Sequence, residues 1–164
     1  MTTRRQHLST LAGLFGALAG MSGLAAATSA HGARVYDLLL SEAEWKKRLD
    51  PAQYAVLRRS STERPYTSPL NKEKRAGTFR CAGCARALFS SAAKFESGTG
   101  WPSFWQPLAA TAVYEDSDTS FGMRQTEVAC QGCGGHLGHV FNDGPPPTGL
   151  RYCMNGVAMK FVPA

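Results

Sequence analysis

Two short stretches, Cys81-Ala82-Gly83-Cys84 and Cys130-Gln131-Gly132-Cys133, indicate how this chain folds. Each is a C-x-x-C turn with glycine at the third position, a layout that lets two thiolates converge on one ion. Two such turns supply a tetrahedral sulfur site, which suits zinc. Because 45 residues separate the pairs, the ion would tie together two hairpins that are distant in the chain. Four sulfur ligands leave no open position, so we predict one structural zinc per chain, held by Cys81, Cys84, Cys130 and Cys133.

Other uses of these four cysteines stay open at this point. One pair could be a redox dithiol, but a thioredoxin-like motif needs a βαβ context, and the sequence shows none. All four thiols could form disulfides if the protein is exported to an oxidising compartment. Iron is a further candidate for the same sulfur site.

The chain has five cysteines, so Cys153 is left over. A lone cysteine is most often a buried core thiol. Cys153, however, stands in the stretch RYCMN, where Arg151 and Asn155 fall on its face of an expected strand. A nearby cation lowers the pKa of a thiol and favours the reactive thiolate. We therefore take Cys153 as a candidate nucleophile, to which Asn155 offers a directed hydrogen bond.

Two further stretches carry residues suited to chemistry. The stretch 136–144, HLGHVFNDG, holds His136 and His139, which are candidates for proton transfer because the cysteines already fill the metal site. A second metal site formed with Asp143 is the alternative. In the glycine- and proline-containing stretch 97–105, Trp101 is a candidate wall of an apolar pocket, and Phe104 is expected in the core.

Turn and capping signals predict a mainly β domain with two short helices before it. Ser41 and Glu44 form a capping box for a helix over 45–49, and Asp50-Pro51 starts a second helix that ends near Ser60. Glycine, proline, aspartate and asparagine separate the later apolar runs, which indicates an antiparallel all-β core. The expected strands occupy 78–80, 87–89, 112–115, 124–129, 138–141, 151–154 and 157–162.

Five motifs follow one another in a recognisable order: C-x-x-C, S-G-x-G-W-P-S-F, C-x-x-C, H-L-G-H-V-F and R-Y-C-x-N. Together they strongly resemble the methionine-R-sulfoxide reductases, the B-type methionine sulfoxide reductases, over nearly all of 42–161. The resemblance implies a zinc-carrying β-tent fold, with two twisted antiparallel sheets and small helices in front. It also implies a peptide-methionine (R)-S-oxide reductase that repairs oxidised proteins, with free methionine sulfoxide as a further candidate substrate.

In the mechanism that this resemblance implies, the Cys153 thiolate attacks the sulfoxide sulfur and becomes a sulfenic acid. A histidine donates the proton, and Trp101 packs against the terminal methyl group of the substrate, with Phe141 as a second substrate-binding residue. The implied catalytic residues are Cys153, His136, His139, Asp143, Asn155 and Arg151.

The chain departs from part of the family at one position. Many members carry a resolving cysteine between the glycines of S-G-x-G-W, where this chain has Thr99. Since the other four cysteines are assigned to metal, we expect an external thiol, from a thioredoxin-like protein or a small molecule, to reduce the sulfenic acid.

The N-terminus predicts export. Arg4 and Arg5 precede an uncharged run over 8–29, and the stretch 3–8, TRRQHL, is similar to a twin-arginine motif. We expect an export signal over 1–30 that is removed in the periplasm, a linker over 31–40 and the reductase domain over 41–164. An uncleaved membrane anchor, an organelle transit peptide and cytoplasmic residence are the alternatives.

Composition narrows the expected partners. The chain is 43% hydrophobic and only 18% charged with a net charge of +6, which fits a globular domain and argues against a nucleic-acid-binding tail. We expect a monomer that meets oxidised proteins and a thiol reductant but no nucleic acid. The main rival is a non-catalytic zinc-binding β-tent interaction module, which has no need of Cys153 beside Arg151. A zinc-ribbon nucleic-acid binder is the third candidate, prompted by basic clusters at 46–48, 58–59 and 72–75.

Overall fold

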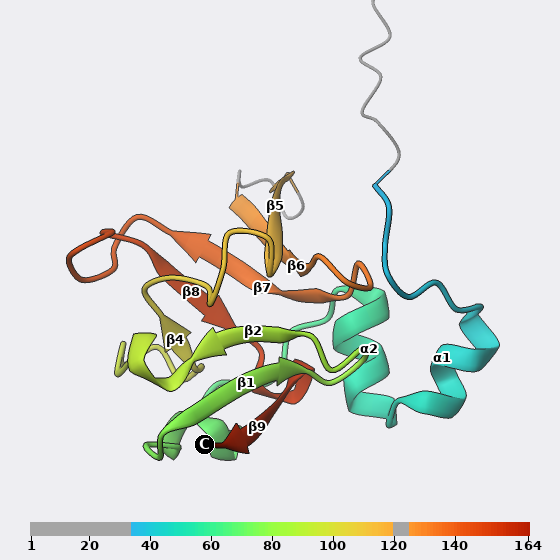
Figure 1. The fold of residues 1–164 in the computed structure, drawn as a ribbon, viewed down its shortest axis with the longest axis horizontal. Helices are drawn as coiled ribbons and strands as arrows, with labels where there is room; N and C mark the ends of the chain where they lie inside the picture. Colours follow the sequence, from blue (N-terminus) through green and yellow to red (C-terminus); the bar gives the residue numbers. More distant parts are fainter. Residues whose placement is uncertain (1–33, 120–124) are drawn as a thin grey trace, which may run out of the picture. The chain divides into compact units, whose positions relative to one another are not determined.

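The computed structural model describes residues 34–119 and 125–164, so the expected export signal lies outside the described residues. The described chain forms a mainly β domain with two antiparallel sheets, which confirms the predicted fold class (Figure 1). The smaller sheet has the strand order β2-β1-β9, with β1 at Gly77–Cys81, β2 at Ala87–Ser90 and β9 at Met159–Pro163. The larger sheet has the order β3-β4-β8-β7-β6-β5. Its strands are β3 Lys94–Phe95, β4 Ser103–Phe104, β5 Val113–Asp118, β6 Gln125–Cys130, β7 His136–Phe141 and β8 Arg151–Met154.

Two helices precede the sheets, and each follows directly on the N-cap residue that the sequence indicated, although the first covers 42–48 rather than the expected 45–49. Helix α1 (Glu42–Arg48) has a complete capping box between Ser41 and Glu44. Helix α2 (Pro51–Arg59) is capped by Asp50 and ends at Ser60 in a left-handed conformation. Figure 1 shows both helices at the end of the sheets where β1 turns into β2 and β6 turns into β7, and α2 packs against β7. The helices therefore lie beside the two C-x-x-C turns.

The structure differs from the sequence prediction in several short elements. Strands β3 and β4 were not predicted, because two residues are too few to show alternation. Three 3-10 turns also lie in stretches expected to be loop or strand: η1 at Pro69–Lys72, η2 at Ser91–Ala93 and η4 at Gly156–Ala158. The last one makes the predicted strand over 157–162 wrong at its start, since η4 occupies 157–158 and β9 begins only at Met159.

Aromatic rings fill the core between the sheets. Phe104 is fully buried, as predicted, and its ring stacks on Phe89 with the centroids 4.4 Å apart. Phe79 meets the same ring edge-on at 4.9 Å. Such pairs contribute about 0.5–1.5 kcal/mol each beyond the burial of their surface, so this cluster packs strand β4 of the larger sheet against β1 and β2 of the smaller one.

Residues 34–40, within the expected linker, lie against the domain. The backbone N–H of Leu38 donates to the carbonyl of Gly132 over 2.9 Å, and the Tyr36 and Tyr114 hydroxyls are 3.1 Å apart. Asp37 forms an ion pair with Arg86. Among the described residues, no helix has the length and apolar character needed to cross a bilayer.

Candidate active site and metal centre

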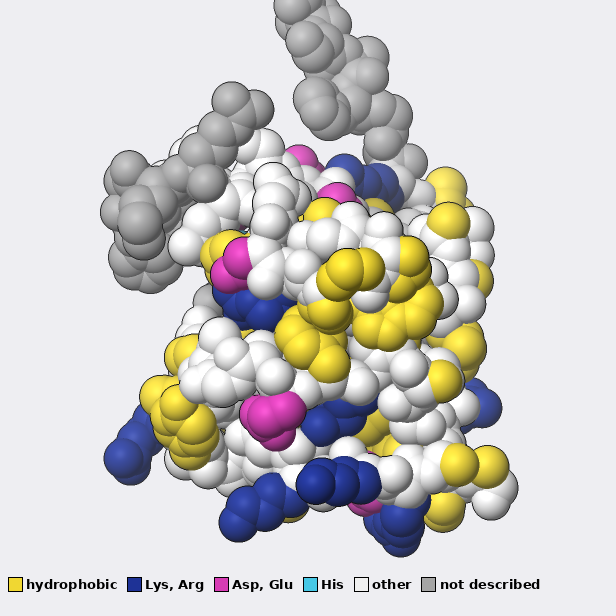
Figure 2. Space-filling model, turned by 90° about the vertical axis from the view of Figure 1, so that its left-hand side faces the viewer, with side chains coloured by type: hydrophobic (Ala, Val, Ile, Leu, Met, Phe, Trp, Pro, Cys, Tyr) yellow, Lys and Arg dark blue, Asp and Glu magenta, His cyan; other side chains and the backbone are white. Residues whose placement is uncertain are grey.

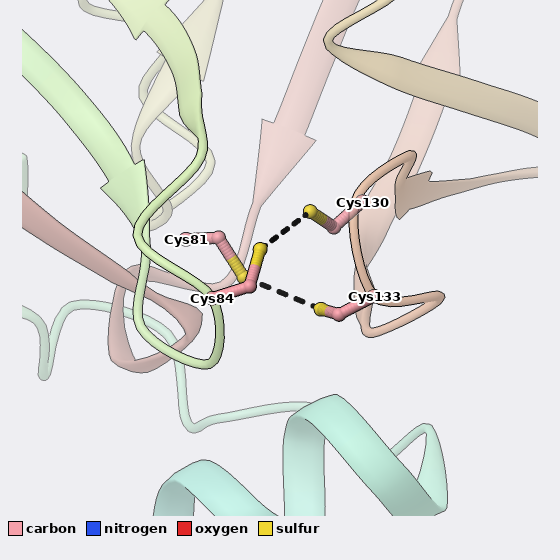
Figure 3. A group of neighbouring side chains, drawn as sticks. All are labelled: Cys81, Cys84, Cys130 and Cys133. Atoms are coloured by element: carbon pink, nitrogen blue, oxygen red, sulfur yellow. Dashed lines mark hydrogen bonds between the residues drawn. The ribbon is translucent and has the colours of Figure 1, made fainter. Parts of the chain in front are cut away.

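The four paired cysteines meet in one cluster. Cys81 and Cys84 come from the β1–β2 turn, and Cys130 and Cys133 come from the β6–β7 turn, so each pair belongs to a different sheet (Figure 3). All four sulfur atoms lie within 4.8 Å of one another. The Cys81–Cys133 and Cys84–Cys130 sulfur distances are 3.8 and 3.5 Å. A tetrahedral zinc with bonds of about 2.3 Å needs sulfurs about 3.8 Å apart, so these residues fit a metal ion.

The same distances argue against disulfides among the four cysteines. A disulfide needs sulfurs about 2.05 Å apart, and all four thiols are free in the structure. Four thiolates at this separation repel one another unless a cation lies among them. Two arginines hold the turns from outside, with Arg48 donating to the Gly83 carbonyl and Arg58 to the Cys133 carbonyl. The arrangement is a closed sulfur cage that joins the two sheets.

Cys153 lies apart from this cage, in the centre of the six-stranded sheet. In the antiparallel ladders it pairs with Ser103 of β4 on one side and with His139 of β7 on the other. Gly138 makes the close approach of β7 possible, because a Cβ atom there would lie 2.1 Å from the Cys153 carbonyl oxygen. The thiol opens into a pocket of about 280 Å³. Of the predicted site residues, this pocket is lined by Cys153, His139, Asn155, Trp101 and Phe141.

Burial dominates the electrostatics of Cys153. It raises the pKa of this thiol above its ordinary value, while the Thr99 hydroxyl and Arg151 act in the opposite direction. The Thr99 Oγ1 and Cys153 Sγ atoms are 3.8 Å apart. The expectation that Arg151 favours the thiolate is therefore right about the direction of its own effect, but desolvation outweighs it and the net shift is upward.

Arg151 and Asp143 form a pair beside the pocket rather than within its lining. The guanidinium donates to both carboxylate oxygens of Asp143, over 2.8 and 2.9 Å, and stacks on the Phe141 ring at 4.5 Å. This pairing lowers the pKa of Asp143 and raises that of Arg151. Asp143 thus holds Arg151, and Arg151 supports the aromatic wall of the pocket.

The two histidines occupy different surroundings. His139 lines the pocket, and its Nε2 lies 3.0 Å from a carboxylate oxygen of Asp118. His136 is buried and does not line it, with Nδ1 2.6 Å from a Glu127 carboxylate oxygen and Nε2 lacking a hydrogen-bond partner among the described residues. Of the two candidates for proton transfer, only His139 faces the space where a substrate would lie.

The sequence reasoning assigned no role to several residues in or behind this pocket. Its lining also includes Ser60, Thr62, Asp118 and Gln125. Glu63 accepts a hydrogen bond from the Trp101 indole on its backbone carbonyl and donates its backbone N–H to Asn155. The surrounding stretch Thr62-Glu63-Arg64-Pro65 gives no local signal for these contacts, because the partners are 38 and 92 positions away. Asp118 gives none, because its partner is 21 positions away.

A larger groove lies elsewhere on the domain. Its volume is about 950 Å³, and its walls include Trp105, Tyr114, Leu150 and Tyr152. Tyr152 precedes Cys153 on β8, so the two side chains point to opposite faces of the sheet. The groove is lined by no cysteine or histidine, so size alone does not locate the pocket of Cys153 and His139.

Several side chains of the basic clusters pair within the domain. Lys46 and Arg59 both pair with Glu42, and Arg75 pairs with Glu73. On the face drawn in Figure 2, hydrophobic side chains gather near the centre, and Lys and Arg side chains lie around them, mostly along the lower edge. This face lacks the continuous basic surface that a nucleic-acid backbone requires.

Comparison with known proteins agrees with the site geometry. Residues 49–163 match the model of the SelR domain. Peptide methionine sulfoxide reductase MsrB of Bradyrhizobium diazoefficiens is 56% identical over 126 residues, which cover 77% of this chain and 91% of that protein. The MsrB protein of Pseudomonas putida is 58% identical over 120 residues, which cover 73% of this chain and 90% of that protein. That of Methanosarcina barkeri is 54% identical over 121 residues, which cover 74% of this chain and 85% of that protein. The resemblance drawn from the five motifs is confirmed: the chain belongs to the SelR domain family of MsrB-type peptide methionine sulfoxide reductases.

Proposed function

We propose that this chain reduces methionine-R-sulfoxide in proteins to methionine with Cys153 as nucleophile. The observation that carries the proposal is the convergence of Cys153, His139 and Trp101 on one pocket. The Cys153 sulfur attacks the sulfoxide sulfur. The oxygen then passes to the Cys153 sulfur while its bond to the substrate sulfur and the sulfur–sulfur contact both break, which leaves Cys153 as a sulfenic acid. One thiol and one sulfoxide thus become one sulfenic acid and one thioether, so the sulfoxide is reduced and Cys153 is oxidised.

His139 is the proposed proton donor to the sulfoxide oxygen. The oxygen gains negative charge as the sulfur–sulfur contact forms, so a proton supplied at that moment lowers the barrier. Asp118, 3.0 Å from the His139 Nε2 atom, would orient the ring. Trp101 would receive the methyl group of the substrate, and Asn155 would hold the sulfoxide oxygen with its amide.

An external thiol completes the proposed cycle. Thr99 lies nearest to the Cys153 sulfur where many family members carry a resolving cysteine, and the four other cysteines form the metal cage. The first external thiol would displace the sulfenic oxygen as water and form a mixed disulfide with Cys153. A second thiol would then release Cys153 and leave as a disulfide. A thioredoxin-like protein and a small thiol are both chemically able to do this.

We further propose that zinc is the ion of the sulfur cage. Four thiolates in tetrahedral reach of one another are the donor set that structural zinc prefers. When bound, the ion would supply folding free energy rather than chemistry, because the cage leaves no position for a substrate.

Export to the periplasm stays a proposal that rests on the sequence of residues 1–30. It would place this activity among envelope proteins that become oxidised. Cell fractionation of the full chain, with Arg4 and Arg5 changed to lysine as the matched variant, tests it. Export that is unaffected by this change would overturn the twin-arginine route.

Turnover of the separate R and S epimers of a methionine sulfoxide peptide tests the reaction, with a dithiol as reductant. We expect reduction of the R epimer only, and its loss in Cys153→Ser at unchanged metal content. Cys84→Ser, which removes a cage ligand instead, is the matched control and should lose the metal. Retained turnover in Cys153→Ser would overturn the proposal.

A further inference from the structure

Glu63 contacts two of the pocket residues through its own backbone. Its carbonyl oxygen accepts from the Trp101 indole Nε1 over 3.1 Å, and its N–H donates to the Asn155 side-chain oxygen over 2.9 Å. Trp101 is on the loop before β4 and Asn155 follows β8, so Glu63 joins two walls of the pocket that come from different parts of the chain.

The side chain of Glu63 fixes where this backbone lies. Its carboxylate accepts from the N–H groups of Gly156 and Val157, the first two residues of η4, with the second bond at 3.0 Å. Bonds from backbone N–H groups to a carboxylate are about twice as strong as those between neutral groups. Residue 156 must be glycine at this packed position, because a Cβ atom there would lie 1.9 Å from the Ser68 hydroxyl and 3.3 Å from the Glu63 carboxylate. The carboxylate thus anchors Glu63 to the backbone of Gly156, which lies three residues after Cys153.

Asn155 gains its orientation from the same contact. Its side-chain oxygen accepts from Glu63, and its Nδ2 donates to the Leu137 carbonyl over 3.0 Å. With both ends of the amide fixed, the second N–H of Nδ2 is the donor that is left for the pocket. Moving Glu63 would therefore disturb both Trp101, which would receive the methyl group of the substrate, and the Asn155 amide, which would face the sulfoxide oxygen.

We propose that Glu63 is the positioning residue that holds Trp101 and Asn155 in the geometry for sulfoxide reduction, an inference that rests on the proposed function. Glu63 touches no reacting atom in this scheme, so its effect passes through its two neighbours. A displacement of about 1 Å at a site of this kind can cost up to about 100-fold in rate.

Glu63→Gln tests the proposal because it keeps the shape of the side chain. The amide has one carbonyl oxygen, so it can accept only one of the two N–H bonds and turns an NH₂ group toward the other. Glu73→Gln is the matched control, since the Glu73 carboxylate also accepts a backbone N–H, from Arg75, but lies outside the pocket. We expect kcat/KM for the R epimer to fall about 10- to 100-fold in Glu63→Gln and to stay unchanged in Glu73→Gln.

A second readout does not depend on turnover. The three tryptophan indole N–H groups give separate NMR signals, and Trp101→Phe assigns that of Trp101. In Glu63→Gln this signal should shift and exchange faster with solvent, while the Trp45 and Trp105 signals stay in place. If the variant loses the metal or the fold, Glu63→Asp, which keeps the charge, takes its place in both measurements.

Unchanged kcat and KM, or an unchanged Trp101 signal, in a folded Glu63 variant would overturn the positioning role. A lower melting temperature with unchanged turnover would also overturn it, because the residue would then act on stability alone. Retained turnover in Cys153→Ser would instead overturn the proposed function, while the indole signal would still report on Glu63.

Discussion

The Thr99 hydroxyl lies 3.8 Å from the Cys153 sulfur, which makes Thr99 the direct neighbour of the proposed nucleophile. The same hydroxyl is 2.9 Å from that of Ser97, whose oxygen is in turn 2.7 Å from the buried Ser103 hydroxyl. Thr99 is thus held in place by a chain of hydroxyl groups. It contacts the Cys153 sulfur but cannot form a disulfide with it.

Thr99→Cys should therefore supply the resolving thiol that this chain lacks. The new sulfur would start from the position of an oxygen already in contact with Cys153, so we expect a disulfide between the two after one turnover. Peptide mapping by mass spectrometry without reductant would detect it, and labelling of the sulfenic acid by a dimedone probe should disappear. Ser97→Cys is the control, because the Ser97 hydroxyl contacts those of Thr99 and Ser103 rather than the Cys153 sulfur. A persistent sulfenic acid in Thr99→Cys would contradict the proposed geometry.

The reactivity of Cys153 should increase with pH well into the alkaline range. Burial raises the pKa of this thiol, so the thiolate fraction grows about tenfold per pH unit until the raised pKa is reached. Alkylation by iodoacetamide, followed on the Cys153 peptide, measures the midpoint. Arg151→Met removes a group that lowers this pKa and should move the midpoint further up. A midpoint below the ordinary cysteine value in the unmodified chain would contradict the dominance of burial.

The repeated C-x-x-C spacing predicted the metal cage, because one tight turn brings its two thiols together whatever the rest of the fold does. The capping boxes at Ser41 and Asp50 likewise fixed both helix starts, since capping acts within three residues. The choice between His136 and His139 could not be made in this way. They stand three positions apart in one strand, and the pairing of β7 with β8 decides which one faces Cys153. The role of Glu63 also depends on partners 38 and 92 positions away, which no local pattern reveals.

The different surroundings of the two histidines should separate their effects. His139→Gln removes the proposed proton donor, so we expect kcat for the R epimer to fall about 10²- to 10⁴-fold with little change in melting temperature. His136→Gln acts on a buried ring bound to Glu127 and should mainly lower the melting temperature. Steady-state kinetics and thermal unfolding of both variants make the comparison. A larger loss of kcat in His136→Gln than in His139→Gln would reverse the assignment.

Removing the metal should unfold the domain rather than only inactivate it. The cage joins the β1–β2 turn of one sheet to the β6–β7 turn of the other, so loss of the metal removes this link between the two sheets. We expect about one zinc per chain by elemental analysis, and a loss of cooperative thermal unfolding when a chelator removes it. Cys84→Ser should reproduce this effect, whereas Cys153→Ser should keep both the zinc and the melting temperature, because Cys153 lies outside the cage. A chelated protein that still unfolds cooperatively at the original temperature would show that the ion is not structural, since the four thiols would then be stable without it.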